Sequence, residues 1–325
     1  MDKSCILPLT TLNLTTGGIL PCCASHLPTY FSGIVLVNPK DAKDAWNNPE
    51  WKRFRKRIAN DDYGVCHSCP IYKQKTESWA TADEIAVKYP EVGKFKKGEL
   101  DDVNPSTLIV SFDERCNLHC LTCRPYTFGK DKTIPSMVDA AREYAKTASK
   151  IVIAGDGEIA VSPYYKELLT SYEGKAEITI MTNGTLVNEK FWASIPERVL
   201  KENIKAVHVS GDGTTKELFE SIRRGADFDK WASNTKLLNE MRLSYGWHTK
   251  LIYTVNKRNI DDMHNVTGFA KWLGFRSIHL QPVTEFRRLI YGDEFWYTHH
   301  EIMFSQEELA DVTDRIKEIN ESYNG

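Results

Sequence analysis

The sequence has no apolar run long enough to span a bilayer, and residues 1–5 do not begin a secretory signal. We therefore expect a cytoplasmic protein with no membrane partner. The net charge is only −2, so the chain lacks the basic excess typical of a nucleic-acid-binding protein, and no nucleic-acid partner is expected. Over 325 residues, 41% are hydrophobic and 26% are charged, which is ordinary for a globular protein.

Cysteine is absent from the last two hundred residues, although core cysteines would normally scatter over all parts of a fold. Cytosolic proteins rarely keep disulfides, so these thiols are expected to be free or metal-bound. They form two sets, each with spacings typical of metal ligands. The first set is Cys5, Cys22, Cys23, Cys66 and Cys69, and the second is Cys116, Cys120 and Cys123.

The second set forms a CxxxCxxC motif in Cys-Asn-Leu-His-Cys-Leu-Thr-Cys, residues 116–123, directly after the strand-like run 108–112. Three thiolates on one loop can bind three irons of a [4Fe-4S] cube and leave the fourth iron for a non-protein ligand. Two alternatives stay open. His119 could complete a zinc site, or the thiols could be buried core residues.

From residue 106 onward, strand patterns alternate with helical patterns, which predicts a parallel α/β fold. In such folds the active site lies at the carboxyl ends of the strands. The expected strands are 108–112, 150–154, 177–181, 206–210, 250–255 and 277–281. The expected helices include 136–148, 163–171, 228–241 and 260–273.

A CxxxCxxC motif after a first strand resembles the radical S-adenosylmethionine (radical SAM) superfamily. The resemblance implies a partial (β/α)6 TIM-type barrel whose [4Fe-4S] cluster is held by Cys116, Cys120 and Cys123. It implies that the open iron chelates the amino and carboxylate groups of SAM. One electron from the cluster would then cleave SAM to methionine and a 5′-deoxyadenosyl radical.

The loop after the second expected strand reads Gly155-Asp156-Gly157-Glu158. The superfamily usually has Gly-Gly-Glu-Pro here, where backbone and acid bind the amino group of SAM. Glycine permits close backbone approach, and a carboxylate accepts hydrogen bonds from an ammonium group. Asp156 is additional, so either Asp156 or Glu158 could be the amino-group partner, and a plain βα turn remains the alternative.

Further candidate SAM contacts follow the later strands. Asn183 lies in a Thr-Asn-Gly segment, although Asn-Gly is also a common turn. Ser210 begins a Ser-Gly-Asp-Gly segment that is followed by two adjacent arginines. By the resemblance, Ser210 and Arg223, in preference to Arg224, contact the carboxylate or ribose of SAM. Gln281 ends the sixth strand and is expected near the adenine.

Residues 3–70 have the order cysteine, glycine turn, Cys-Cys, aromatic helix and CxxC. The run 12–20 predicts a hairpin, and Asn48 is expected to cap a helix beginning at Pro49. This order resembles the SPASM/twitch auxiliary-cluster module of radical SAM enzymes, which usually follows the barrel. A structural zinc ribbon is the alternative.

The resemblance implies four thiolate ligands for a second [4Fe-4S] cluster: Cys5, Cys22 or Cys23, Cys66 and Cys69. Seven ligands from eight cysteines leave one spare. Adjacent residues in an extended segment point to opposite sides, so Cys22 and Cys23 are not expected to bind the same cube. We favour Cys22 as the ligand. Cys23 is then a packing residue or a hydrogen-atom donor.

The expected organisation is an auxiliary module at 1–75, a bridge at 76–105, the radical SAM core at 106–283 and a C-terminal segment at 284–325. The bridge is expected to contain a helix from Ser78 to Tyr89. Ser305 and Glu308 predict a capping box for a last helix ending near Tyr323.

The hypothesis for function is hydrogen abstraction from a carbohydrate or small metabolite, leading to dehydrogenation or epimerisation. Flavodoxin or ferredoxin is the expected electron donor. The alternatives are modification of a ribosomal peptide or protein, and a non-catalytic iron–sulfur or zinc scaffold.

Overall fold

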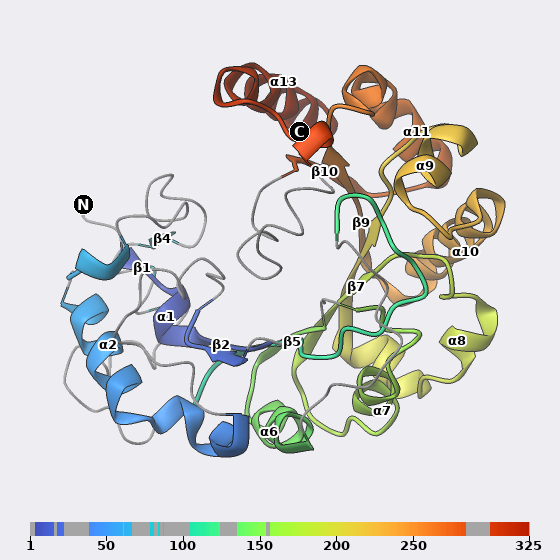
Figure 1. Ribbon diagram of the computed structural model, residues 1–325. Helices are drawn as coiled ribbons and strands as arrows, with labels where there is room; N and C mark the ends of the chain where they lie inside the picture. The colour runs from blue at the N-terminus through green and yellow to red at the C-terminus, as the bar shows by residue number, and fades with distance from the viewer. Residues whose placement is uncertain are drawn as a thin grey trace. The chain divides into compact units, whose positions relative to one another are not determined.

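The computed structural model describes residues 4–15, 18–22, 39–60, 62–66, 79–80, 84, 87, 104–123, 135–153, 157–283 and 300–324. These residues form two compact units (Figure 1). The first unit comprises 1–113, 132–152 and 173–176, and the second comprises 114–131, 153–172 and 177–325. Among the described residues, none of the helices is both long and apolar enough to cross a membrane.

The first unit begins with β1 (Ser4–Cys5), α1 (Leu7–Thr10), β2 (Thr11–Thr15) and β3 (Gly18–Leu20). The expected hairpin is confirmed, because β2 and β3 pair antiparallel. β2 also pairs in parallel with β5 (Thr107–Ser111), and β6 (Lys150–Ile153) lies on the other side of β5. The first strand of the expected core thus shares a sheet with the N-terminal hairpin.

Helices of the first unit are η2 (Pro39–Asn47), α2 (Pro49–Ala59), η3 (Gly64–Cys66) and α6 (Pro135–Ala145). The predicted cap of α2 is confirmed, since Asn48 Oδ1 accepts the backbone N–H of Glu50 at 2.9 Å. Trp46 and Trp51 are buried, with the Arg55 guanidinium 4.2 Å from the Trp46 ring centre. The aromatic residues of this stretch are therefore core residues.

The prediction of a helix from Ser78 to Tyr89 is wrong at its first residues. Trp79 and Ala80 form β4 (Trp79–Ala80), which pairs antiparallel with β1. Pairing with a strand far away in the sequence overrides the local helical pattern there. Most of the remaining residues of that expected helix lie outside the described part of the chain.

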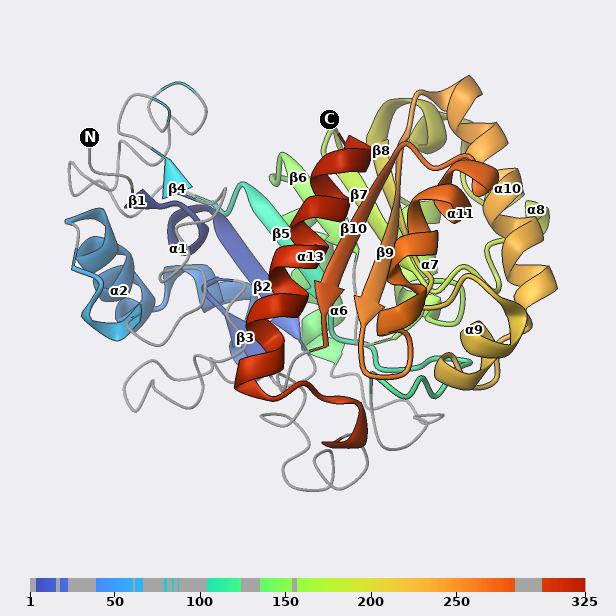
Figure 2. The ribbon, with the colours of Figure 1, turned by 90° about the horizontal axis from the view of Figure 1, so that it is seen from above.

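The second unit has four parallel strands in the order β10-β9-β8-β7. They are β7 (Glu177–Thr182), β8 (Ile204–Ser210), β9 (His248–Val255) and β10 (Ser277–Pro282), which confirms the predicted strands. Alternate residues along β7 are buried, as expected for a strand with one face toward the core. The helices lie outside these strands (Figures 1 and 2).

These helices are α7 (Pro163–Thr170), α8 (Glu189–Ala193), η4 (Val199–Asn203), α9 (Lys216–Ile222), α10 (Phe228–Tyr245), η5 (Ile260–Asn265), α11 (Val266–Leu273), η7 (His300–Ile302) and α13 (Gln306–Asn324). The last helix runs along β10 (Figure 2). Its capping box is confirmed by hydrogen bonds of Ser305 N to Glu308 Oε2 and of Glu308 N to Ser305 Oγ.

Candidate active site

The cysteine loop, residues 116–123, is anchored to the end of α9. His119 N donates to the Arg224 carbonyl at 3.1 Å, and Leu121 N donates to the Ile222 carbonyl at 2.8 Å. Leu118 and Leu121 are buried, whereas the three thiols are only half-buried. The leucines between the cysteines therefore fix the loop to the core.

Asn183 lies against the first thiol of this loop. It follows β7, and its Nδ2 is 3.7 Å from Cys116 Sγ and 3.0 Å from Asn117 Oδ1. The backbone N–H of Leu118 also donates to Cys116 Sγ at 3.4 Å. The structure thus brings the Thr-Asn-Gly segment to the cysteine loop, as their expected positions at strand ends predicted.

Arg223 is buried beside the second thiol. Its Nη1 lies 3.9 Å from Cys120 Sγ, and its Nη2 lies 3.0 Å from Asp212 Oδ2. Asp212 is also buried, and its Oδ1 accepts the backbone N–H of Thr254 at 2.7 Å. The side chain of Arg224, by contrast, is exposed. Of the two adjacent arginines, Arg223 is the one that reaches the cysteine loop with its side chain.

Burial raises the pKa of the Cys120 thiol to about 12, although the Arg223 guanidinium beside it acts in the opposite direction. The thiol is therefore protonated at neutral pH in the absence of a metal. Metals bind the thiolate, so coordination would release this proton. The buried cation next to Cys120 favours the charged form that coordination requires.

Glu158 joins the loop after β6 to the end of β7. Its Oε1 accepts from Thr182 Oγ1 at 2.5 Å and from Ala160 N at 3.4 Å, and its Oε2 accepts from Asn183 N at 2.6 Å. Burial raises the pKa of this carboxyl group, and the donors partly offset that shift. Glu158 thus positions Asn183. Gly155 and Asp156 lie outside the described residues.

Two glycines at strand ends make room for Trp231. A Cβ on Gly184 would lie 2.6 Å from Trp231 Nε1, and one on Gly211 would lie 2.7 Å from Trp231 Cζ2. Gly184 also has φ +81°, which favours glycine. These glycines of the two motifs therefore serve packing on a buried indole. The sequence motifs do not include Trp231, and its only signal in the sequence is its place in the helical stretch that forms α10.

The other expected SAM contacts lie at strand ends or loops of the second unit. Ser210 ends β8 and is half-buried, and Gln281 is exposed near the end of β10. Gly157 is half-buried in the loop before Glu158. Their roles toward SAM stay predictions.

In the first unit, Tyr63 joins two of the cysteines expected to bind the auxiliary cluster. Its hydroxyl accepts the backbone N–H of Cys5 at 3.3 Å, and its carbonyl accepts the backbone N–H of Cys66 at 2.7 Å. Cys22 is buried just after β3. Cys23 and Cys69 lie outside the described residues, so the choice between Cys22 and Cys23 stays a prediction.

Within the described ranges, no three Cys, His, Asp or Glu side chains are placed to hold one metal ion. A cubane cluster poses a different requirement, because each thiolate binds its own iron and the sulfurs stay apart. The donor set on the cysteine loop is three thiols without a carboxylate, which fits iron–sulfur chemistry. The buried Nε of Arg223 has no hydrogen-bond partner among the described residues, so the site retains an unused donor.

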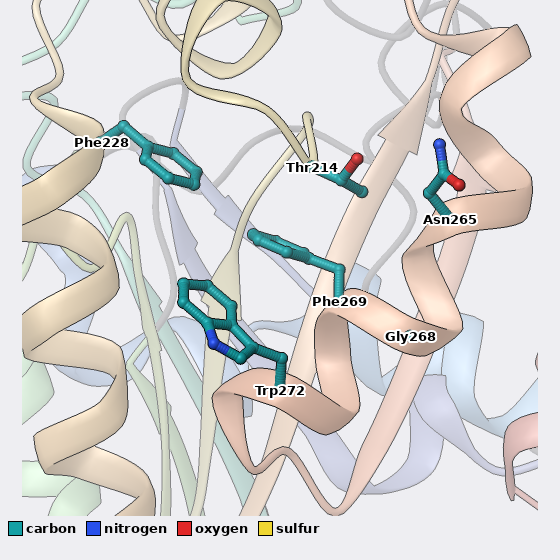
Figure 3. Close-up of a pocket in the computed structure, with 6 residues that line it drawn as sticks. All are labelled: Thr214, Phe228, Asn265, Gly268, Phe269 and Trp272. Carbon is teal, nitrogen blue, oxygen red and sulfur yellow. The ribbon is translucent and has the colours of Figure 1, made fainter.

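A separate open groove of about 450 Å³ lies in the helical layer of the second unit (Figure 3). Figure 3 shows the rings of Phe269 and Trp272 projecting from α11, with Phe228 facing them from α10. Thr214, Asn265 and Gly268 complete the lining. None of these six side chains is titratable, so the groove offers no acid–base or metal chemistry.

A parallel α/β unit with a three-thiol loop and polar side chains at the strand ends places the chain among α/β proteins with a candidate iron–sulfur site. Comparison with known families agrees. Residues 110–270 match the radical SAM superfamily, and residues 5–70 match an iron–sulfur cluster-binding domain named SPASM. The chain belongs to the radical SAM superfamily, with its SPASM domain preceding the radical SAM domain. These domains imply a SAM-binding [4Fe-4S] cluster, an auxiliary cluster and SAM as cofactors.

Curated relatives include a GTP 3′,8-cyclase of Clostridium botulinum (strain Okra), 28% identical over 220 residues, with 64% of this chain and 66% of that protein covered. The corresponding protein of Peptoclostridium acidaminophilum is 29% identical over 194 residues, covering 56% and 57%. The chain therefore spans just under two-thirds of the first relative's length.

Among solved structures, Streptococcus suis SuiB bound to its precursor peptide SuiA superposes with a TM-score of 0.51. The sequence identity is 16%, and 94% of this chain and 67% of that chain are covered. At this identity, the likeness shows the fold alone. It supports the α/β fold predicted from the sequence.

Proposed function

We propose that this protein is an enzyme that cleaves SAM reductively and uses the resulting 5′-deoxyadenosyl radical to abstract a hydrogen atom from a small-molecule substrate. The observation that carries the proposal is the cysteine loop. Its three half-buried thiols lie at the strand ends, with Asn183 and Arg223 in contact with two of them. Cys116, Cys120 and Cys123 would each hold one iron, leaving the fourth iron for SAM.

The described side chains support this chemistry by holding the loop and its surroundings in place. Leu118 and Leu121 anchor the cysteines, and Glu158 fixes the backbone of Asn183. In the first unit, Cys5, Cys22, Cys66 and Cys69 are proposed to hold the auxiliary cluster. Tyr63 keeps the backbones of Cys5 and Cys66 close together.

For the substrate, we propose a small molecule of the nucleotide class. The support is the similarity to proteins named GTP 3′,8-cyclase, whose name describes ring closure on a purine nucleotide. The carbohydrate substrate expected from the sequence has no support from these comparisons, and neither does an oxidoreductase or epimerase class. A cyclisation that follows hydrogen abstraction is therefore the first reaction to test.

A peptide substrate is the second candidate, and the single observation in its favour is the fold shared with SuiB, solved with its precursor peptide. An electron donor such as flavodoxin or ferredoxin stays part of the proposal.

The test is anaerobic reconstitution of the full chain, followed by metal analysis and a SAM-cleavage assay with dithionite. We expect about eight irons per chain for two four-iron cubes and formation of 5′-deoxyadenosine. Two tightly bound zinc ions and no cleavage would refute the proposal. Adding GTP or a candidate peptide, each labelled with deuterium at carbon, identifies the substrate class. The true substrate transfers deuterium into 5′-deoxyadenosine.

A further inference from the structure

The side chain of Arg223 contacts protein groups, whereas its expected role is to contact SAM. The resemblance assigns it to the carboxylate or ribose of SAM. In the structure its guanidinium is buried between an acid and a cysteine, with Nη2 3.0 Å from Asp212 Oδ2 and Nη1 3.9 Å from Cys120 Sγ. Two of its three nitrogens are thus directed at groups of the protein itself.

Asp212 is held firmly on the side away from the arginine. Its Oδ1 accepts the backbone N–H of Thr254 at 2.7 Å, and its carbonyl accepts Asn259 Nδ2 at 3.0 Å. Arg223 is also fixed through its backbone, because its N–H donates to the Phe219 carbonyl at 2.8 Å at the end of α9. Both partners are therefore placed by the fold before any ligand binds.

We infer that Asp212 and Arg223 form a buried ion pair that sets the reduction potential of the cluster at the cysteine loop. The inference rests on the proposed assignment of Cys120 as an iron ligand. Arg223 donates a hydrogen bond to the coordinating sulfur, and the negative charge of Asp212 opposes the effect of the guanidinium on the cluster.

The physical reason is the charge change on reduction. One electron passes from an external donor such as dithionite, which is oxidised, to the cluster, whose total charge becomes one unit more negative. A nearby cation and an N–H···S hydrogen bond stabilise the reduced form, whereas a nearby anion destabilises it. Arg223 therefore raises the potential and Asp212 lowers it. In a buried site both effects are larger than in water.

The experiment is a redox titration of the reconstituted full-length protein, followed by EPR spectroscopy in the absence of SAM. The relevant cluster is the one whose EPR signal changes when SAM is added afterwards. Asp212→Asn removes the negative charge and keeps the size of the side chain, and Arg223→Gln removes the positive charge. The matched control is Arg224→Gln, because this neighbouring arginine has an exposed side chain.

We expect Arg223→Gln to make the one-electron reduction at least tenfold less favourable, a shift of about 59 mV to lower potential. Asp212→Asn should shift the potential upward, the double variant should lie between the two, and Arg224→Gln should match the parent. A purely structural role would not produce shifts of opposite sign.

Parent-like potentials in both single variants, or shifts in the same direction, would overturn the inference. A loss of SAM affinity in Arg223→Gln with an unchanged SAM-free potential would do so as well, because Arg223 would then act on SAM alone. If Arg223→Gln does not assemble a cluster, Asp212→Asn and the double variant, which restores charge balance, still test the signs. Failure of the proposed function appears separately, as a cluster in the parent that neither responds to SAM nor cleaves it.

Discussion

Replacing Gly213 with alanine tests whether the position of α9 determines the position of the cysteine loop. A Cβ added there would lie 2.5 Å from Phe219 N and 2.8 Å from Phe219 Cα, both backbone atoms of α9. Ordinary van der Waals contact begins near 3.4 Å, so α9 must move by about 0.9 Å. Overpacking of this kind typically costs about 1–3 kcal/mol.

That movement reaches the site because the end of α9 holds the loop. Leu121 N donates to the Ile222 carbonyl at 2.8 Å, and a displacement of about 0.9 Å along this bond takes it beyond hydrogen-bonding distance. Arg223, the next residue, moves with it. For Gly213→Ala we therefore expect a lower urea midpoint, fewer irons retained on reconstitution and weaker SAM binding.

The matched control is Gly268→Ala in α11. A Cβ there meets no atom within 4 Å, so the same methyl group fits the open groove without strain. Alanine in place of glycine inside a helix should raise stability by about 0.5–1 kcal/mol. If Gly213→Ala matches this control in stability, iron content and SAM affinity, the argument linking α9 to the cysteine loop is refuted.

Two further predictions concern single side chains of the second unit. Glu158→Gln should weaken SAM binding by calorimetry with full iron content, because an amide replaces one of the two carboxylate oxygens that hold Thr182 and Asn183 in place, and a hydrogen bond to a charged group contributes about 1.5–3 kcal/mol. Parent-like affinity would contradict this positioning role. His248, whose Nε2 lies 2.7 Å from Ser277 Oγ, has a pKa lowered from 6.5 by burial and by Lys250. The contribution of His248 to the free energy of unfolding is complete above pH 6.5 and is lost as the pH falls through the lower pKa of the folded state. His248→Gln should therefore make the free energy of unfolding depend less on pH below pH 6.5, as measured by urea unfolding at a series of pH values.

Much of the fold was predictable because the local signals were strong. The alternation of apolar residues predicted the strands β7 to β10, and each predicted end lies within two residues of the observed end. Asn48 before Pro49, and Ser305 with Glu308, marked helix starts by side-chain capping, which acts within one turn. Such features depend on neighbours in the sequence.

Strand partners were not predictable in the same way. The pattern of residues 12–14 indicates a strand, but not that β2 pairs in parallel with β5. The same limit explains the error at Trp79, which pairs with Cys5 as part of β4. Partner choice depends on long-range contacts that a local pattern does not contain.

In the site, the sequence predicted that Asn183 follows a strand and that Arg223 lies close to SAM, but it did not predict which protein groups these side chains contact. Asp212 stood in the Ser-Gly-Asp-Gly segment, yet only the folded chain shows its carboxylate beside Arg223. Glu158 was expected to face SAM, and the structure shows its oxygens accepting from Thr182, Asn183 and Ala160. The direction of a side chain is set by packing, which the motif alone leaves open.

The central claim is that the cysteine loop carries the cluster that cleaves SAM. The most direct measurement is iron content together with 5′-deoxyadenosine formation in the variant with Cys116, Cys120 and Cys123 all replaced by alanine. The account predicts that iron falls from about eight to about four per chain, with the auxiliary cluster retained, and that SAM cleavage is lost. SAM cleavage at the parent rate in this variant would contradict it.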